Sequence, residues 1–183
     1  MFIFDKNTNN LIMALIKSVK GKTPIFGDNV YTAENSTIVG DVIIGNNCSI
    51  WFAAVIRGDV NSIRIGNNVN IQDGAVIHCT FKKSKTIWGN NISIGHNAVV
   101  HGCIINDNAL VGMGAIIMDG AIVESNTIIA AGAVVLEGTR VESGSIYAGV
   151  PAKKVKELNS EQTDRLINGI SNNYLIYSSW FKD

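Results

Sequence analysis

The apolar side chains of this chain recur with a period of six residues. Branched aliphatic residues hold this period over the second half of the chain, at Ile105, Val111, Ile117, Val123, Ile129, Val135 and Val141. A small side chain follows four positions after each of them, at Ala109, Ala115, Ala121, Thr127, Ala133, Thr139 and Ser145. This period suits neither an amphipathic helix nor an alternating strand. It predicts a solenoid in which each group of six residues, a hexad, forms one short strand and one turn.

The same phase runs back through the first half of the chain, with interruptions. It is carried by Ile38, Ile44, Ile50, Ile56, Ile65, Ile71, Ile77, Trp88, Ile94 and Val100. Residues are inserted at 60–64 and at 79–87, and one residue is missing before Ile105. Hexapeptide repeats of this kind resemble those of the left-handed parallel β-helix, a triangular prism with three hexads per coil. The left hand comes from the resemblance, because the spacing alone does not fix it.

We therefore predict an all-β domain, a left-handed parallel β-helix, over residues 13–151. Residues 1–12 precede the repeat and are expected to form an N-terminal extension. Residues 152–183 are expected to be a C-terminal helical segment, since apolar side chains from Leu166 to Tyr177 have roughly helical spacing. Ser160 is the expected N-cap of this α-helix. The helix is expected to cover apolar surface on an outer face of the prism.

Composition narrows the range of partners. The chain has 183 residues, of which 46% are hydrophobic and 16% are charged, and its formal net charge is zero. This predicts one domain with a sizeable core and gives no support for binding to nucleic acid or to an anionic membrane. The three cysteines form no regular framework, which indicates a reducing, cytoplasmic location. No apolar stretch is long enough to span a membrane.

All three histidines of the chain, His78, His96 and His101, lie within one short segment. Neutral imidazole is a common ligand of Zn²⁺ and of neighbouring transition metals. His78 and His101 each follow an inward aliphatic residue, and one full coil separates them when residues 79–87 are treated as a loop. They should therefore stack on one face in adjacent coils, about 4.8 Å apart, close enough to share a metal ion.

His96 occupies a different position of its hexad and should lie around a corner of the prism from the other two histidines. It is a poor third ligand within the same subunit. At the seam of a three-fold homotrimer, however, His96 of a neighbour could complete the site. Three protein ligands leave a position for water, which is the pattern of catalytic rather than structural zinc.

Polar residues near the histidines follow the same phase. Arg57 shares the hexad position of His78 and His101, and Asp59 follows it on the same strand. Asp73 shares the position of His96 and is expected to stack below it, with Gln72 beside it. An Arg–Asp ion pair at the seam could hold subunits together and also orient a bound water or anion.

Several segments closely resemble gamma-class carbonic anhydrases and their relatives. They are Ser49-Ile-Trp-Phe-Ala-Ala-Val-Ile-Arg-Gly-Asp59, Asn70-Ile-Gln-Asp-Gly74, Ile94-Gly-His-Asn-Ala-Val-Val-His-Gly-Cys103, Leu110-Val-Gly-Met-Gly-Ala115 and Ala148-Gly-Val-Pro-Ala-Lys153. The resemblance implies a homotrimer of left-handed β-helices with metal sites between subunits. It matches the metal ligands to His78, His96 and His101, and the supporting residues to Arg57, Asp59, Gln72 and Asp73. Tyr147 lies near the place where some members carry a polar active-site residue.

The chain departs from the family pattern at two positions. The best-characterised members carry a glutamate after the Arg-X-Asp motif, where this chain has Val60. A second glutamate lies on a loop after the first histidine, and here residues 79–87 are basic and contain no carboxylate. We therefore expect that neither Val60 nor the loop 79–87 offers a carboxylate to carry protons away from the site.

The residues and the resemblance together leave three hypotheses. The first is a metalloenzyme in which hydroxide bound to Zn²⁺, Fe²⁺ or Co²⁺ converts CO₂ reversibly to bicarbonate. The second is a hexapeptide-repeat acyltransferase that uses acyl-CoA, although no histidine is left over as its metal-free base. The third is a trimeric scaffold that is weak as a catalyst and uses the metal as a clip, which the missing glutamates favour.

Overall fold

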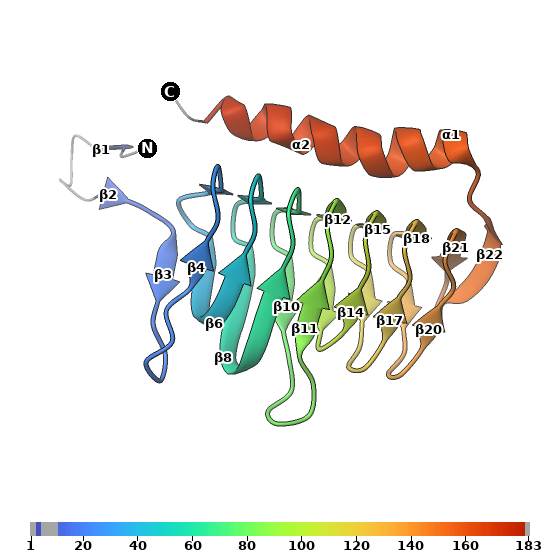
Figure 1. The fold of residues 1–183 in the computed structure, drawn as a ribbon, viewed down its shortest axis with the longest axis horizontal. Coiled ribbons are helices and arrows are strands. Elements are labelled where there is room, and N and C mark those ends of the chain that lie inside the picture. Colours follow the sequence, from blue (N-terminus) through green and yellow to red (C-terminus); the bar gives the residue numbers. More distant parts are fainter. Residues whose placement is uncertain (1–2, 5–10, 182–183) are drawn as a thin grey trace.

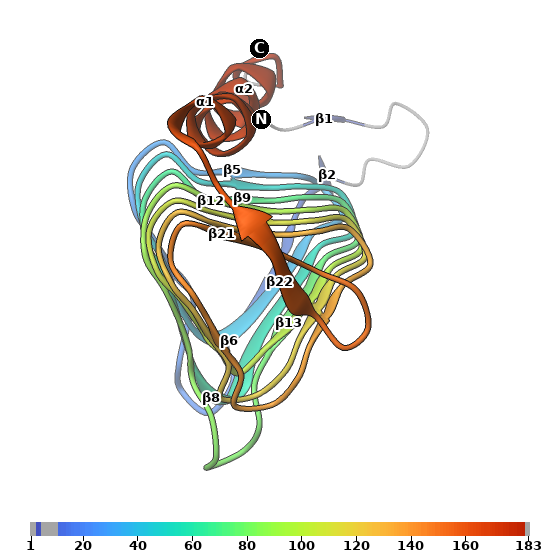
Figure 2. The ribbon, with the colours of Figure 1, turned by 90° about the vertical axis from the view of Figure 1, so that its right-hand side faces the viewer.

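A computed structural model describes residues 3–4 and 11–181 of the chain. Short strands stack in parallel register to form a left-handed β-helix, which confirms the solenoid that the hexads predicted and the hand that the resemblance implied. Viewed along its axis, the coil is triangular, and a C-terminal helix lies outside one face (Figure 2). Of the predicted extension 1–12, most residues lie outside those described; strands β1 (Ile3–Phe4) and β2 (Leu11–Ile12) pair antiparallel.

The first face of the prism carries two of the histidines, His78 and His101. It contains β3 (Leu15–Lys17), the first half of β6 (Thr37–Ile44), the first half of β8 (Val55–Ile65), β10 (Val76–His78), β13 (Val99–His101), β16 (Ile116–Ile117) and β19 (Val134–Val135). Strands β6 and β8 are long enough to turn the corner and continue on the second face, so both faces form one hydrogen-bonded sheet.

The other two faces complete each coil. The second face contains β4 (Ile25–Phe26), the second halves of β6 and β8, β11 (Thr86–Trp88), β14 (Ile104–Ile105), β17 (Ile122–Val123) and β20 (Arg140–Val141). The third face contains β5 (Tyr31–Thr32), β7 (Ser49–Ile50), β9 (Asn70–Ile71), β12 (Ile92–Ile94), β15 (Ala109–Val111), β18 (Thr127–Ile129) and β21 (Ser145–Ala148). Figure 1 shows these coils stacked along the prism axis.

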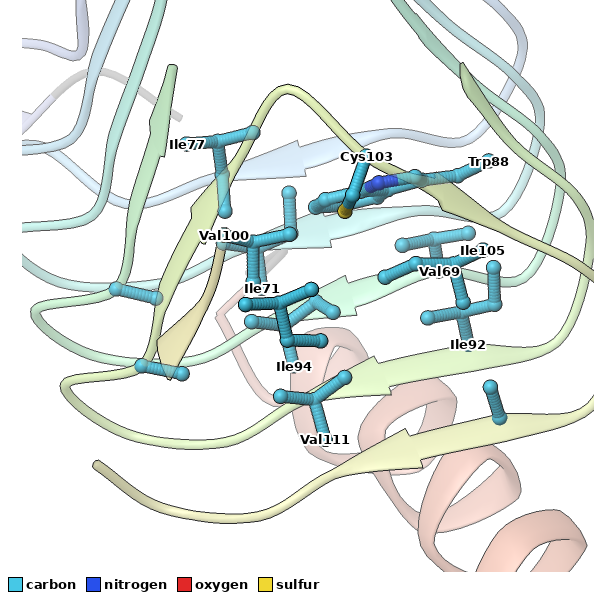
Figure 3. Close-up of a cluster of buried hydrophobic side chains, with 14 of the residues drawn as sticks. Val69, Ile71, Ile77, Trp88, Ile92, Ile94, Val100, Cys103, Ile105 and Val111 are labelled. Atoms are coloured by element: carbon cyan, nitrogen blue, oxygen red, sulfur yellow. The ribbon is translucent and has the colours of Figure 1, made fainter. Parts of the chain in front are cut away.

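The inward aliphatic residues form one continuous core. Ile77, Ile94, Val100 and Ile117 are 0% exposed, as the repeat predicted, and adjacent layers stack on one another (Figure 3). Such residues are close-packed in the interior of the coil and supply most of its stability. The cysteines Cys48, Cys79 and Cys103 are free thiols buried in the same core. All three cysteines are therefore packing residues of the core.

Asparagines supply the turns at one corner. Positive φ angles recur there, at Asn47, Asn68, Asn91, Asn108 and Asn126. Asparagine tolerates this left-handed conformation better than most residues, which explains its frequency in the repeat. Side chains of neighbouring residues also link the coils, because the amide N–H of Asn46 donates to Asn67 Oδ1 at 2.7 Å.

The C-terminal segment begins with a strand rather than a helix. Strand β22 (Lys153–Glu157) runs antiparallel to β21, so the helical part of segment 152–183 starts later than its predicted boundary. It comprises α1 (Ser160–Gln162), a π-helical stretch (Thr163–Asn168) and α2 (Gly169–Ser179). The N-cap is Asn159 and not Ser160, because the Asn159 carboxamide accepts from Gln162 N–H and the Gln162 side chain accepts from Asn159 N–H.

Helix α2 packs on the third face, which confirms the predicted covering of an outer face. The ring of Tyr174 meets Trp51 edge to face, with centroids 5.3 Å apart. Ser171 Oγ donates to the carbonyl of Asn68 at 3.2 Å. No helix in the described part of the chain is both long and apolar enough to cross a membrane.

Candidate metal centre

His78 and His101 lie side by side on the outer surface of the first face. They end strands β10 and β13 and are in register, as predicted from the phase of the repeat. Nδ1 of His78 is 3.1 Å from Nε2 of His101. Two nitrogen ligands of a tetrahedral Zn²⁺, each about 2.0–2.1 Å from the ion, would be roughly 3.3–3.4 Å apart. The pair therefore fits a shared metal ion with shifts of only a few tenths of an ångström.

His96 lies apart from this pair, in the turn between the third face and the first. Its Nδ1 is 2.9 Å from Asp73 Oδ2, which confirms the predicted stacking of these two residues. Its Nε2 is 3.5 Å from the hydroxyl of Tyr174 on α2. Within residues 3–4 and 11–181, no three His, Cys, Asp or Glu side chains converge on one metal position. The corner thus separates His96 from the other two histidines of its own chain.

Each histidine pairs one ring nitrogen with an aspartate. The pairs are His78 Nε2 with Asp59 Oδ1 at 3.2 Å, His96 Nδ1 with Asp73 Oδ2 at 2.9 Å, and His101 Nδ1 with Asp119 Oδ2 at 3.0 Å. A histidine that binds a metal commonly donates its other N–H to a carboxylate, which fixes the ring and raises its basicity. The donor set and its supporting carboxylates therefore fit a transition-metal site.

The charge states of His78 and Asp59 also suit metal binding. Burial lowers the pKa of His78, although its hydrogen bond with Asp59 acts in the opposite direction. Burial opposes ionisation of Asp59, but hydrogen bonds from Arg57 and His78 outweigh it and hold the pKa of this carboxyl below its ordinary value. A neutral imidazole beside a carboxylate is the state that a metal ion requires of its ligands.

Arg57 pairs with Asp59 of its own chain. Its guanidinium NH1 lies 2.7 Å from Asp59 Oδ2, and the arginine side chain is 46% exposed. The pair expected at the seam therefore already exists within one subunit. Because Asp59 also contacts His78, Arg57 holds the carboxylate that orients this histidine.

Gln72 lies near His96 rather than near the pair. It is buried, and its Nε2 donates to Asn70 Oδ1 at 3.0 Å. It lines a largely apolar cavity of about 380 Å³ between the third face and α2, together with His96, Met113 and Tyr174. Sequence reasoning placed Tyr174 on the helix but missed that it would reach His96.

Tyr147 is not brought to the histidines. It lies on β21, three strands along the third face from β12, and its side chain is part of the hydrophobic core. The N–H of Glu142 donates to its hydroxyl at 3.5 Å. This geometry gives no support to a catalytic role for Tyr147.

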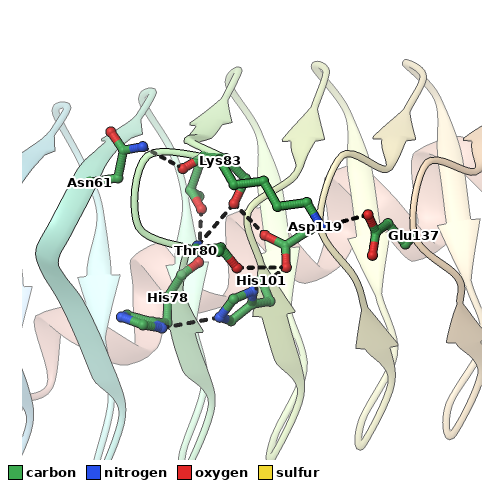
Figure 4. A network of polar contacts seen from close by, with 9 residues as sticks. Asn61, His78, Thr80, Lys83, His101, Asp119 and Glu137 are labelled. Atoms are coloured by element: carbon green, nitrogen blue, oxygen red, sulfur yellow. Dashed lines mark hydrogen bonds and ion pairs between the residues drawn. The ribbon is translucent and has the colours of Figure 1, made fainter.

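Asp119 is the residue that sequence reasoning missed. It follows β16 and reaches the loop 79–87, where it accepts hydrogen bonds from Thr80 and Ser84, and it also contacts His101 (Figure 4). Burial opposes its ionisation, but the hydrogen bonds from Ser84 and Thr80 outweigh it and lower its pKa. Asp119 thus adds a carboxylate beside His101 that was not predicted, although Val60 and the loop 79–87 themselves offer none. Its hexad position, at the same corner as Gly102 one coil earlier, was the available signal.

Comparisons with known proteins identify the family of the chain. A family model described as bacterial transferase hexapeptide (six repeats) matches residues 23–58 and 102–137. A protein named "Probable carbonic anhydrase" from Methanocaldococcus jannaschii is 56% identical over 149 residues, covering 81% of this chain and 91% of the relative. Carbonic anhydrase from Geobacillus kaustophilus is 45% identical over 168 residues, covering 92% and 91%. The chain belongs to the gamma carbonic anhydrase family.

Other members and solved structures define how far this likeness extends. The mitochondrial gamma carbonic anhydrase 2 of Arabidopsis thaliana is 41% identical over 152 residues, and the match spans 80% of this chain but only 55% of that protein. A hexapeptide transferase family protein from Anaplasma phagocytophilum superposes with a TM-score of 0.85 at 36% identity, covering 91% of this chain and 98% of that one. An acyltransferase from Campylobacter jejuni, at 20% identity and a TM-score of 0.58, shares the fold alone.

Proposed function

We propose that this gamma carbonic anhydrase family member is a homotrimeric metalloenzyme that hydrates CO₂ reversibly to bicarbonate. His78 and His101 of one subunit and the partner subunit's His96 would hold one divalent ion at each seam, Zn²⁺ or alternatively Fe²⁺ or Co²⁺. The observation that carries this proposal is the set of three aspartate-backed histidines, two in register and the third at an adjoining corner. Such a set is incomplete in one subunit and complete where two corners meet.

Apolar rows on the outer surface support assembly. Outward side chains of the first face stack coil on coil, in the row Val55, Val76, Val99, Ile116 and Val134. Ile87 and Ile104 form a similar row on the second face and are 44% and 37% exposed. Contiguous exposed apolar surface on both sides of the His78–His101 corner is typical of a subunit interface.

The roles of individual residues follow from their contacts. A bound Zn²⁺ supplies Lewis-acid chemistry, lowering the pKa of a coordinated water toward about 7. Asp59, Asp73 and Asp119 each hold one histidine ring in place. Arg57 fixes Asp59 and keeps it ionised. Gln72 presents a buried carboxamide next to His96, where it could hydrogen-bond an oxygen of the substrate.

Two other functions have particular observations in their favour. The cavity beside His96 and the likeness to solved transferases favour an acyltransferase that takes acyl-CoA. Val60, which packs on the core, and the loop without glutamate favour a metal-clipped scaffold with little catalysis. The acyltransferase requires no metal at the histidines, and the scaffold requires metal but no turnover.

Mixed trimers test the proposed site. Neither His96→Ala chains alone nor His78→Ala/His101→Ala chains alone should bind a metal ion tightly. Trimers reassembled from both should regain one complete seam wherever the intact His96 meets the intact pair. Metal content, CO₂ hydration and acyl transfer are measured on the same sample. Full metal binding by an isolated single subunit would overturn the shared site, and a filled site without hydration would favour the scaffold.

A further inference from the structure

The Asp119 carboxylate contacts two parts of the molecule at once. Its Oδ2 lies 3.0 Å from Nδ1 of His101 and accepts from Thr80 Oγ1 at 3.0 Å. Its Oδ1 accepts from the hydroxyl of Ser84. One side of the group thus faces a candidate metal ligand, and the rest faces the loop 79–87 that follows the other candidate ligand, His78 (Figure 4).

Further hydrogen bonds and an ion pair hold the loop 79–87 in place. The N–H of Thr80 donates to Ser84 Oγ at 3.0 Å, and Asn61 Nδ2 donates to the Ser84 carbonyl at 2.8 Å. Lys83 forms an ion pair with Glu137 at 2.7 Å, three coils away. Gly102 makes the approach possible, because a Cβ at this position would overlap both Asp119 Oδ1 and Ser84 Oγ.

The chemistry of the contact fixes the state of the His101 ring. An ionised carboxylate can only accept hydrogen bonds, so Nδ1 of His101 must carry the proton. The lone pair of a neutral ring then lies on Nε2, the atom that is 3.1 Å from His78 Nδ1. The carboxylate of Asp119 therefore accepts hydrogen bonds both from the His101 ring and from the loop.

We propose that Asp119 is a positioning residue that selects the Nδ1–H form of His101 and ties this ring to the loop 79–87. The order of the loop and the readiness of His101 to bind a metal then depend on the same carboxylate. This proposal rests on the proposed function for the metal ion, but the contacts of Asp119 with His101 and with the loop are present without an ion, so the tautomer can be tested in the metal-free protein.

The first test uses the metal-free protein. ¹⁵N NMR of the imidazole rings reports which nitrogen of His101 carries the proton. Wild-type protein should show Nδ1–H, Asp119→Ala should move His101 toward the Nε2–H form, and Ser84→Ala should leave it unchanged because only the loop side is cut. Sedimentation and circular dichroism verify that each variant is folded. An unchanged His101 tautomer in folded Asp119→Ala would overturn the proposal.

The second test measures the loop and the metal separately. Trypsin should cut after the loop lysines faster in Asp119→Ala and in Ser84→Ala than in wild type. Co²⁺ titration, followed by visible absorption, should show an affinity about 10–100-fold weaker for Asp119→Ala and unchanged for Ser84→Ala. Wild-type affinity and spectrum in Asp119→Ala would overturn the positioning role. If wild-type protein binds no Co²⁺, the proposed function fails, while the NMR and trypsin results still decide the role of Asp119.

Discussion

Two stretches of the prism share one core but differ in coil length. After Ile104, parallel partners are 18 residues apart, as in the series Ile104, Ile122 and Arg140. The coil that joins His78 to His101 takes 23 residues. Ile77 and Ile117, inward residues of the two stretches, are equally buried. The extra residues leave the core unchanged and emerge at a corner, where the hydroxyls of Thr80 and Ser84 reach the Asp119 carboxylate beside His101. In this solenoid, the candidate site therefore lies where the coil is longer than the regular 18 residues.

The largest effect should be the same in both stretches. Ile117→Ala in the regular coils and Ile77→Ala in the longer coil should each lower the free energy of unfolding by about 2–5 kcal/mol. Each substitution leaves a cavity in the core, and the surrounding residues relax into it only partially. Denaturant unfolding at one protein concentration measures both. A much smaller cost for Ile77→Ala would break the comparison by showing that the insertion loosens the core.

Substitution of two glycines at one corner, Gly102 and Gly120, should affect stability differently in the two stretches. Gly102 and Gly120 both have positive φ, +54° and +69°. At Gly120 a Cβ would meet nothing closer than 3.8 Å, so Gly120→Ala should cost about 1–2 kcal/mol for its backbone conformation alone. Gly102→Ala should cost about 1–3 kcal/mol more through overpacking against Asp119 and Ser84. Thermal unfolding compares the two, and equal costs would mean that the loop moves aside freely.

Metal binding should stabilise the longer coil selectively. Zn²⁺ at about 100 times its Kd should raise the free energy of unfolding by about 2.7 kcal/mol. Amide hydrogen exchange should slow most at β10 and β13 and least at β20, because each coil contacts only its neighbours. His101→Ala is the control and should show no such change. Equal protection along the whole prism would contradict a local site.

The success of sequence reasoning differed between positions on strands and contacts made by the loop. The inward positions and the His78–His101 register could be predicted because both depend only on the phase of the repeat. The phase also places Asp119 at the corner next to Gly102, but its contacts with Thr80 and Ser84 could not be predicted because the repeat does not determine the path of the loop. Asn159 was missed by one position because Ser160 is also a common cap residue, and only the reciprocal bonds to Gln162 distinguish them.

The smallest expected effect concerns the ion pair between Lys83, at the tip of the loop, and Glu137. Lys83 and Glu137 are 54% and 55% exposed, so solvent screens their ion pair and Glu137→Gln should leave the free energy of unfolding nearly unchanged. It should nevertheless speed tryptic cleavage in the loop, because the ion pair is a contact between the loop tip and the regular coils. Salt should reproduce this increase in wild-type protein by screening the pair, and it should have little effect on the variant. Cleavage that neither the substitution nor salt alters would show that the ion pair at the tip does not hold the loop, and that the contacts of the loop with Asp119 and Asn61 hold it instead.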